Sequence, residues 1–368
     1  MRRLDVVLVV VLLGIAVVAA QEPPSTSAFA RWEILDPEAR VMRYLGRESL
    51  FLVEGVAWLP DAAFADGAIA FDVALHGQTG FAGVAFRGQS ATDYELIYLR
   101  THRSRQWDAL QYTPIFGLQE AWQLYAGAGY NAAAELPLNR WVHVEVVVAG
   151  PTARVHIDHA VEPQLTVTDL KRPRSSGRVG LWGRFGAANF SNVTVTPAPP
   201  AARSVADAPR GAPLPGVITR WALSPADKAP ADPPGGLPTI SSWEAVEAEP
   251  SGILNLARFR RPAPAVAGQL DRVLARAVLR STAARPVRLA FGYSDAVTIF
   301  LNGRAIFSGR NAYLERDGSA LGTMTLGPDT LHLDLRAGAN ELVFAVSERF
   351  GGWGLAARLL DPSGVTVE

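Results

Sequence analysis

The chain contains no cysteine among its 368 residues, and this absence excludes several kinds of chemistry. Disulfides, thiolate metal sites, cysteine nucleophiles and cysteine-linked lipids all need that side chain. An exported protein of this length can hold its fold without disulfides if its hydrophobic core is large. Hydrophobic residues make up 49% of the sequence, so a core of that kind is expected.

The chain also lacks an excess of charge, because 35 basic residues balance 35 acidic ones. This balance gives no electrostatic reason to expect a nucleic acid or an anionic membrane surface as the partner. Two motifs are missing as well: the Gly-x-Ser-x-Gly elbow of serine hydrolases, and a Gly-x-Gly-x-x-Gly phosphate loop between a strand and a helix. Their absence argues against those two kinds of site.

One long apolar run stands out, at residues 6–18, with Arg2 and Arg3 before it and small residues after it. The run is shorter than the ~20 residues of a membrane-spanning helix. The pattern predicts a signal peptide over residues 1–20 with cleavage near Gln21, and an uncleaved anchor is the alternative. We therefore expect a periplasmic or extracellular protein that has no membrane contact after cleavage.

Short alternating strands dominate the rest of the chain. Clusters of Gly, Pro, Asn, Asp and Ser separate them, and helical periodicity is scarce. The clearest strand segments of the first half lie at residues 68–75, 80–87, 94–100, 141–150 and 153–159. Strands at this spacing, without helices between them, indicate an antiparallel sandwich.

Residues 197–216 divide the chain, with six Pro, six Ala and no aromatic residue. Such a stretch cannot build a core and is expected to be a semi-rigid linker. The block after it, residues 217–368, has strands of its own, and Asn302-Gly303 between alternating apolar residues predicts a type I′ hairpin. The predicted fold class is therefore all-β, with two antiparallel β-sandwich domains of the jelly-roll type joined by a Pro/Ala-rich linker.

Family resemblance sharpens both domain predictions. The segment NRWVHVEVVVAGPTARVHIDH resembles the concanavalin A-like and laminin-G-like jelly rolls in Trp141, the Gly150 turn and the strand that ends at Asp158. The segment GFAGVAFRGQSATDYELIYLR is similar to keto-disaccharide hydrolase-like relatives. These resemblances imply a jelly-roll domain over residues 30–196. The segments SDAVTIFLNGRAIFSG and LRAGANELVFAVSERFGGWGL resemble galactose-binding-like sandwiches, which implies such a domain over residues 217–368.

The stretch DYELIYLRTHRSRQWDALQY, residues 93–112, mixes charged and aromatic residues with apolar strand residues. The resemblance to jelly-roll lectins implies a sugar groove on the concave face of such a sheet. Aromatic rings would stack on the C–H face of a sugar, while polar side chains would bond its hydroxyls. The predicted ligand-binding residues are Arg87, Glu95, Tyr98, Arg100, His102, Trp107, Gln111 and Tyr112. A solvated sheet face with ordinary ion pairs is the alternative interpretation.

The pairing register decides which of these side chains look outward. If residues 82–87 and 93–100 pair across GQSAT, Val84 and Phe86 share a face with Tyr98, and Glu95 lies on the other face. A shift of one residue exchanges the two sets, so the choice stays open.

Tryptophans offer further candidates for stacking. Trp107 and Trp122 lie among polar and aromatic residues and could stack on a ligand, whereas Trp141, Trp182 and Trp353 lie in strand motifs and are expected in the core.

A hydrolytic alternative depends on carboxylates. Glycoside hydrolysis needs two of them about 5–10 Å apart. Glu95 with Asp93 or Asp108 is the grouping in a suitable place, but the Glu-x-Asp-x-x-Glu pattern of the sandwich glucanases is absent. We therefore predict no catalytic residue.

Metal and cofactor sites have little support. His156, Asp158 and His159 do not share one strand face, and calcium, although possible in related jelly rolls, has no dense Asp/Asn loop here. No cofactor and no metal site are predicted. The resulting hypothesis is an exported protein that binds a carbohydrate or glycoconjugate without evident catalytic machinery. The alternatives are a glycoside hydrolase and a structural or interaction module of the cell envelope.

Overall fold

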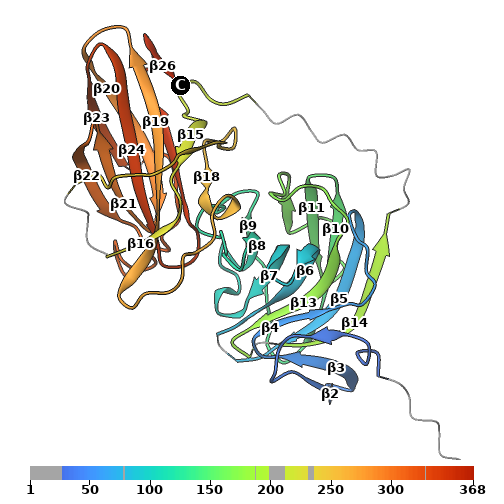
Figure 1. The fold of residues 1–368 in the computed structure, drawn as a ribbon. Coiled ribbons are helices and arrows are strands. Elements are labelled where there is room, and N and C mark those ends of the chain that lie inside the picture. The colour runs from blue at the N-terminus through green and yellow to red at the C-terminus, as the bar shows by residue number, and fades with distance from the viewer. Residues whose placement is uncertain (1–26, 78, 187, 199–211, 231–235, 328) are drawn as a thin grey trace, which may run out of the picture.

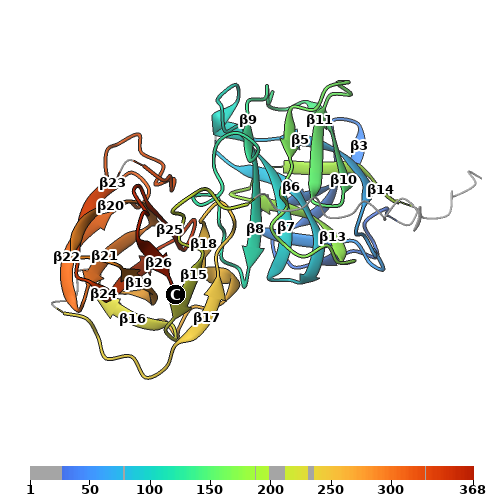
Figure 2. The ribbon, with the colours of Figure 1, turned by 90° about the horizontal axis from the view of Figure 1, so that it is seen from above.

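A computed structural model describes residues 27–368 except 78, 187, 199–211, 231–235 and 328. The predicted signal peptide and most of the predicted linker lie outside the described residues. Two β-sandwiches stand side by side, one from each half of the chain (Figure 1 and Figure 2). The prediction of an all-β fold with antiparallel sandwiches is confirmed. No helix in the described part of the chain is long and apolar enough to cross a membrane.

Two seven-stranded sheets form the first sandwich. One sheet has the order β1-β4-β13-β6-β7-β8-β9, with β1 Glu33–Ile34, β4 Gly55–Trp58, β13 Arg178–Arg184, β6 Phe81–Ser90, β7 Asp93–Arg100, β8 Leu110–Phe116 and β9 Asn131–Ala132. The other has the order β12-β11-β10-β5-β14-β3-β2, with β12 Leu165–Val167, β11 Thr152–Ile157, β10 Trp141–Ala149, β5 Gly67–Leu75, β14 Ala188–Pro197, β3 Arg47–Leu52 and β2 Arg40–Tyr44.

Period-two alternation explains how these strands bury a core. In β10, Val142, Val144, Val146 and Val148 all point inward and are buried, while the residues between them are partly exposed. They pack with the inward side chains of the facing sheet into one continuous hydrophobic cluster. The outer face of the first of these sheets carries a second, smaller cluster of apolar and aromatic side chains, which includes Trp58, Tyr98 and Trp182.

The register between β6 and β7 differs from the one we assumed. Val84 pairs with Ile97 and Phe86 pairs with Glu95, so Val84 and Phe86 share a face with Glu95 rather than with Tyr98. The ladder shifts between Phe86 and Ser90. At that shift Arg87 adopts a φ of 50°, which is a left-handed backbone conformation. Between the pairs Phe86–Glu95 and Ser90–Asp93, three residues of β6 stand opposite one residue of β7. Of the two registers left open above, the structure therefore has the one that brings Glu95 to the face of Val84 and Phe86.

The second sandwich also has two sheets. The larger has the order β17-β15-β19-β24-β21-β22, and β16 and β26 also pair with β19. Its strands are β17 Glu244–Glu247, β15 Arg220–Leu223, β19 Gln269–Ser281, β24 Gly338–Glu348, β21 Ala296–Leu301, β22 Arg304–Arg310, β16 Asp227–Pro230 and β26 Val365–Val367. The smaller has the order β18-β25-β20-β23, with β18 Leu254–Asn255, β25 Gly354–Leu359, β20 Arg285–Ser294 and β23 Asp329–Leu335.

The predicted hairpin at Asn302-Gly303 is confirmed. These two residues join β21 to β22 and have φ values of 52° and 82°. Both central positions of a type I′ turn need a positive φ, which Asn and Gly tolerate best. This local signal was sufficient because it depends on no distant partner.

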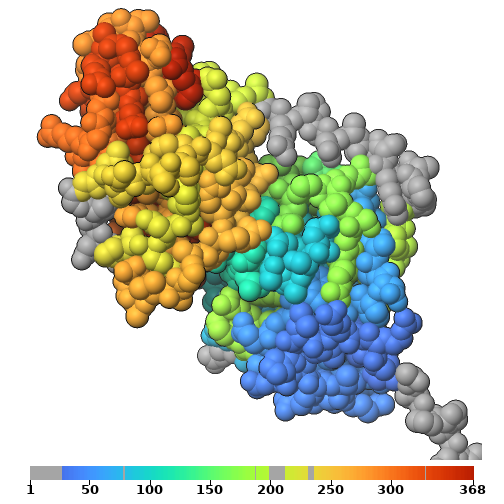
Figure 3. Space-filling model, in the orientation of Figure 1, coloured from blue at the N-terminus to red at the C-terminus, as the bar shows by residue number. Residues whose placement is uncertain are grey.

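The loop between β8 and β9 joins the two sandwiches. Its Ala121, Leu124 and Tyr125 pack with Met324 and Ala356 of the second sandwich in one hydrophobic cluster. The backbone N–H of Gln123 donates to the Gly351 carbonyl, and the Met324 N–H donates to the Gln123 carbonyl. Figure 3 shows the two bodies in contact along one side. We refer to residues 121–125 as the bridging segment.

Candidate functional site

Glu95 and Tyr112, two of the predicted ligand residues, lie between the sheets. Glu95 is fully buried and accepts hydrogen bonds from the Tyr112 hydroxyl at 2.7 Å and the Arg172 N–H at 2.9 Å. Burial raises the pKa of Glu95, and these two donors only partly offset that effect. Both carboxylate oxygens are engaged by protein groups. Glu95 and Tyr112 therefore hydrogen-bond with each other inside the sandwich. They do not line a groove, contrary to our prediction.

Arg87 and Gln111 are buried in the same way. The Arg87 guanidinium bonds Asp66 at 3.0 Å and the Gly150 carbonyl at 2.6 Å. The Gln111 amide donates to the Tyr125 carbonyl at 3.1 Å. These contacts join segments that are far apart in the sequence, and they use the polar groups of both side chains inside the protein. The predicted ligand role of Arg87 and Gln111 therefore does not fit the structure. Trp107 is 46% exposed in the turn before β8 but lies outside the pocket described next.

Tyr98, Arg100 and His102 do converge, at a pocket of about 250 Å³ between the two sandwiches. They project from the outer face of β7 and from the short 3-10 helix η1, Thr101–Arg103. The pocket is lined by Thr79, Phe81, Tyr98, Arg100, His102, Glu120, Trp122, Trp182, Arg184, Phe185, Tyr313 and Phe350. Only the last two come from the second sandwich.

A first group of aromatic rings forms the wall on the sheet. Phe81 and Tyr98 meet edge to face with ring centroids 5.7 Å apart, and Tyr98 lies 5.4 Å from Trp182. Phe185 packs 5.6 Å from Phe81. Trp182 was expected in the core, yet it lies on the outer face of β13 and lines the pocket. We refer to these four rings as the sheet wall.

A second group of rings lines the same pocket and includes both residues that come from the second sandwich. Trp122, from the bridging segment, lies 6.2 Å from Tyr313 and 6.4 Å from Phe350, and the last two are 6.0 Å apart. Trp122 was a predicted stacking candidate, and the structure places it in the pocket. We refer to these three rings as the domain wall.

The backbone around Phe350 is held by a buried acid. Asp295 accepts hydrogen bonds from the N–H groups of Arg349 at 2.7 Å and Phe350 at 3.1 Å. Burial raises the pKa of Asp295, and these donors oppose that rise. The position of the domain wall is therefore set by a side chain in the interior of the second sandwich.

Charged groups lie between the walls. The Arg100 guanidinium bonds Asp108 at 2.7 Å and lies 6.0 Å from the centre of the Phe81 ring and 5.9 Å from that of Trp122. Glu120 accepts from Arg184 at 2.5 Å through one oxygen. Its second oxygen has no partner among the described residues.

Glu120 and His102 are both affected by their surroundings. Burial raises the pKa of Glu120, although the nearby Arg184 lowers it. Burial and the neighbouring Arg100 and Arg103 lower the pKa of His102, so the imidazole is neutral at neutral pH. A neutral imidazole can both donate and accept, which suits hydroxyl groups.

The carboxylates nominated for hydrolysis do not meet in this pocket. Asp108 is buried, and its two oxygens bond Arg100 and Arg103. Asp93 bonds Arg172 at 3.4 Å, and neither it nor Glu95 lines the pocket. Among the described residues, Glu120 is the one carboxylate that does. The described residues include no group of three or more His, Asp or Glu side chains placed to hold a metal ion.

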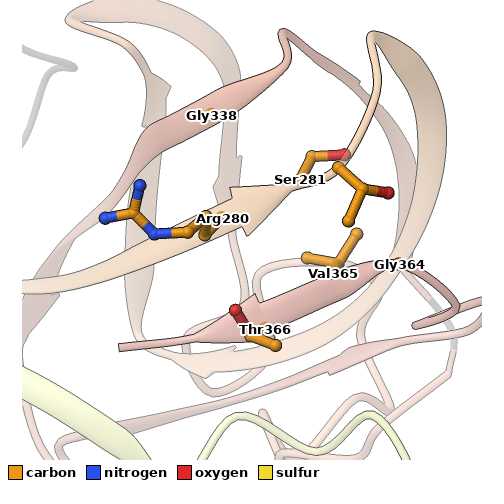
Figure 4. Close-up of a pocket in the computed structure, with 7 residues that line it drawn as sticks. Arg280, Ser281, Gly338, Gly364, Val365 and Thr366 are labelled. Carbon is orange, nitrogen blue, oxygen red and sulfur yellow. The ribbon is translucent and has the colours of Figure 1, made fainter.

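Another hollow has a less suitable lining. It has a volume of about 330 Å³ and lies where β19 meets β26, and Figure 4 shows its Arg280, Ser281, Val365 and Thr366 on these neighbouring strands. No aromatic ring lines it. The Ser281 hydroxyl already donates to the Ala283 carbonyl. This hollow therefore offers few free groups to a ligand.

Several pocket residues escaped sequence reasoning. They are Thr79, Phe81, Glu120, Arg184, Phe185 and Phe350. Phe350 had one local signal, the Gly351-Gly352 pair that follows it. A side chain at Gly351 would meet the Gln123 amide oxygen at 2.7 Å, so this glycine permits the close approach of the bridging segment. Glu120 stands in an irregular loop without any recognisable pattern.

No protein-family model matches the chain, and no curated protein is detectably similar to it. Among solved structures, the carbohydrate-binding module CBM66 from Bacillus subtilis is similar over 44% of this chain and 93% of its own, with 16% identity and a TM-score of 0.33. A Bacillus subtilis protein with a galectin-like fold covers 46% of this chain and 90% of its own, with 14% identity and a TM-score of 0.36. Domains LG4-5 of mouse laminin alpha1 cover 86% and 90%, with 12% identity and a TM-score of 0.28. Similarities this low define neither a family nor a function.

Proposed function

We propose that this chain is an exported carbohydrate-binding protein whose ligand lies in the pocket between the two sandwiches. The observation that carries the proposal is one pocket lined by both aromatic walls, with the Arg100 guanidinium 6.0 Å from the Phe81 ring of one wall and 5.9 Å from the Trp122 ring of the other. A sugar ring has apolar C–H faces and a rim of hydroxyls, so it needs both kinds of surface at once. The pocket supplies both.

Free hydrogen-bonding capacity supports the same ligand. The second Glu120 oxygen and the Tyr98 hydroxyl have no hydrogen-bond partner within the described ranges, and both side chains line the pocket. These two groups can therefore bond ligand hydroxyls in place of water. A purely structural module of the cell envelope has no need for this arrangement.

Saccharide binding is tested first on a glycan array and then by calorimetry with the best-bound sugar. Replacing Trp122 by Ala removes the central ring of the domain wall, and we expect the affinity to fall about tenfold or more. Trp107→Ala is the matched control, because Trp107 is an exposed tryptophan outside the pocket. The affinity of the Trp107→Ala variant for the sugar should stay within about twofold of the affinity of the parent protein.

Because Trp122 also contacts the second sandwich, a second variant separates binding from folding. Glu120→Gln keeps the shape of the side chain and removes the charge that pairs with Arg184. It should weaken binding while the melting temperature changes little. The proposal fails if no saccharide binds, or if Trp122→Ala and Trp107→Ala bind equally well.

Export rests on the apolar run and small residues before Gln21. The mature protein from the native host should begin at or near Gln21 by N-terminal sequencing. A protein that keeps Met1 would show that the segment is not removed.

A further inference from the structure

The pocket ends on one side within the sheet. Two residues further along the outer face of β7 from Tyr98 comes Leu96, and after it Tyr94, which packs edge to face on Trp58 with ring centroids 5.5 Å apart. Trp58 is 0% exposed and Tyr94 is 4% exposed. Side chains of the protein therefore fill the sheet face beyond the pocket. A groove for an extended chain cannot continue in that direction.

The second sandwich closes the other side. Arg100 is the next residue after Tyr98 on the outer face of β7, and its guanidinium lies against the Trp122 ring. Trp122 in turn packs against Tyr313 and Phe350. A chain that ran along β7 would meet these rings. At about 250 Å³, the space between the two barriers lies below the roughly 300–1,000 Å³ of pockets that hold drug-sized ligands. It has room for a ligand the size of one sugar ring.

The charges of the pocket are already matched. Arg100 shares Asp108 with Arg103, and Arg184 lies within 3.3 Å of Glu54 and 2.5 Å of Glu120, so three guanidinium groups meet three carboxylates. A ligand carboxylate or sulfate would find no unpaired cation among these guanidinium groups and would approach Glu120. Transfer of that charge out of water would cost free energy without compensation. The lining favours a neutral ligand.

We propose that the pocket recognises one neutral sugar residue at the end of a saccharide chain, held between the sheet wall of the first sandwich and the domain wall, which the bridging segment and the second sandwich form together. This inference rests on the proposed function and adds the ligand class. The rest of the saccharide leaves past the exposed edge of the pocket, where Phe185 and His102 lie. Both sandwiches belong to one site, because Tyr313 and Phe350 contact the terminal residue.

The full chain is titrated by calorimetry with the methyl glycosides of glucose, galactose, mannose, xylose, arabinose and fructose, and with those of glucuronic and galacturonic acid. For the neutral sugar that binds best, the affinity of the methyl glycoside is then compared with the affinities of oligomers of two to five units and of a long polymer. We expect the affinity per chain to change less than about threefold with length, and the polymer to saturate at one protein per recognised chain end. The uronides should bind at least about tenfold more weakly than their neutral counterparts.

Variants test the part played by the second sandwich. Tyr313→Ala and Phe350→Ala remove rings that are 40% and 46% exposed, so folding is not at risk. Each should lower affinity for the neutral methyl glycoside about tenfold, whereas Trp107→Ala should leave it unchanged.

Opposite results would overturn this inference. The first is an affinity that rises about tenfold with each added sugar unit, and the second is a polymer that binds many protein molecules along its length. The third is a uronide affinity equal to that of the neutral sugars. The fourth is unchanged saccharide affinity in both Tyr313→Ala and Phe350→Ala. In each of these cases saccharide binding itself survives. Absence of binding to every saccharide would refute the proposed function instead.

Discussion

Glu249 provides the sharpest test of how the two sandwiches are held together. It follows β17 in the second sandwich and accepts hydrogen bonds from two groups of the first, the Tyr125 hydroxyl at 2.5 Å and the Lys171 ammonium at 2.7 Å. Glu249 and Lys171 are both buried. Burial alone would lower the pKa of Lys171, but Glu249, Tyr130 and Asp169 raise it, so the amine stays charged. Removing the carboxylate would leave this charge without its buried partner.

Breaking a buried ion pair from one side costs about 3–5 kcal/mol. For Glu249→Ala we therefore expect a loss of that size in the free energy of unfolding by urea, and a melting temperature roughly 10 °C lower. Asp169→Ala is the matched control. Asp169 also pairs with Lys171, but its side chain is 54% exposed, so its loss should cost only about 0–1 kcal/mol.

A paired substitution separates the lost charge from lost packing. Lys171→Met combined with Glu249→Leu removes both charges, and we expect it to recover most of the stability that Glu249→Ala loses. The reasoning is refuted if Glu249→Ala is no more destabilising than Asp169→Ala. It is also refuted if the paired variant is as unstable as Glu249→Ala, because the unpaired amine would then not be the cause.

Two further predictions concern single positions. Burial raises the pKa of Glu348, and the neighbouring Asp295 raises it further, so the folded protein keeps this proton to a higher pH than the unfolded chain does. The stability that it contributes is complete below pH 4.5 and is lost as pH rises. The unfolding free energy of the parent protein should therefore fall with rising pH, by up to about 1.4 kcal/mol per pH unit from this group. Glu348→Gln should remove this part of the slope when the unfolding free energy is measured from pH 4 to 8. An unchanged slope would contradict the prediction. Gly83→Ala would place a methyl group 2.1 Å from the Ile97 carbonyl oxygen and should destabilise the protein by about 3 kcal/mol or more, whereas Gly318→Ala meets no atom within 4 Å and should be nearly neutral in thermal melts.

The parts of the fold that depend on neighbours in sequence could be predicted. The alternating valines of β10 and the Asn302-Gly303 turn both formed as expected, because period-two burial and a positive φ are local requirements. The pairing of β6 with β7 could not be predicted. It depends on Arg87, whose guanidinium bonds Asp66 and Gly150 in other parts of the chain.

The candidate site was predictable only in part, for a related reason. Tyr98 and Arg100 lie on one strand, and alternation brings them to the same face in either register. Glu95 was also among the predicted ligand residues, but it lies on the opposite face of the same strand, which points into the interior. Tyr313 and Phe350 reach the pocket only because the two sandwiches dock, and docking leaves no periodic pattern in the sequence.

The bridging segment changes how the covalent connection between the sandwiches should be regarded. Gln123 bonds the second sandwich through its backbone and side chain, and the hydrophobic cluster around Leu124 and Tyr125 does so as well. The two sandwiches therefore contact each other through specific hydrogen bonds and apolar packing, as the subunits of a heterodimer do. We expect that two separate polypeptides, divided within residues 199–211, would assemble when produced together. The chain connection would then act mainly to keep the partners at a high effective concentration.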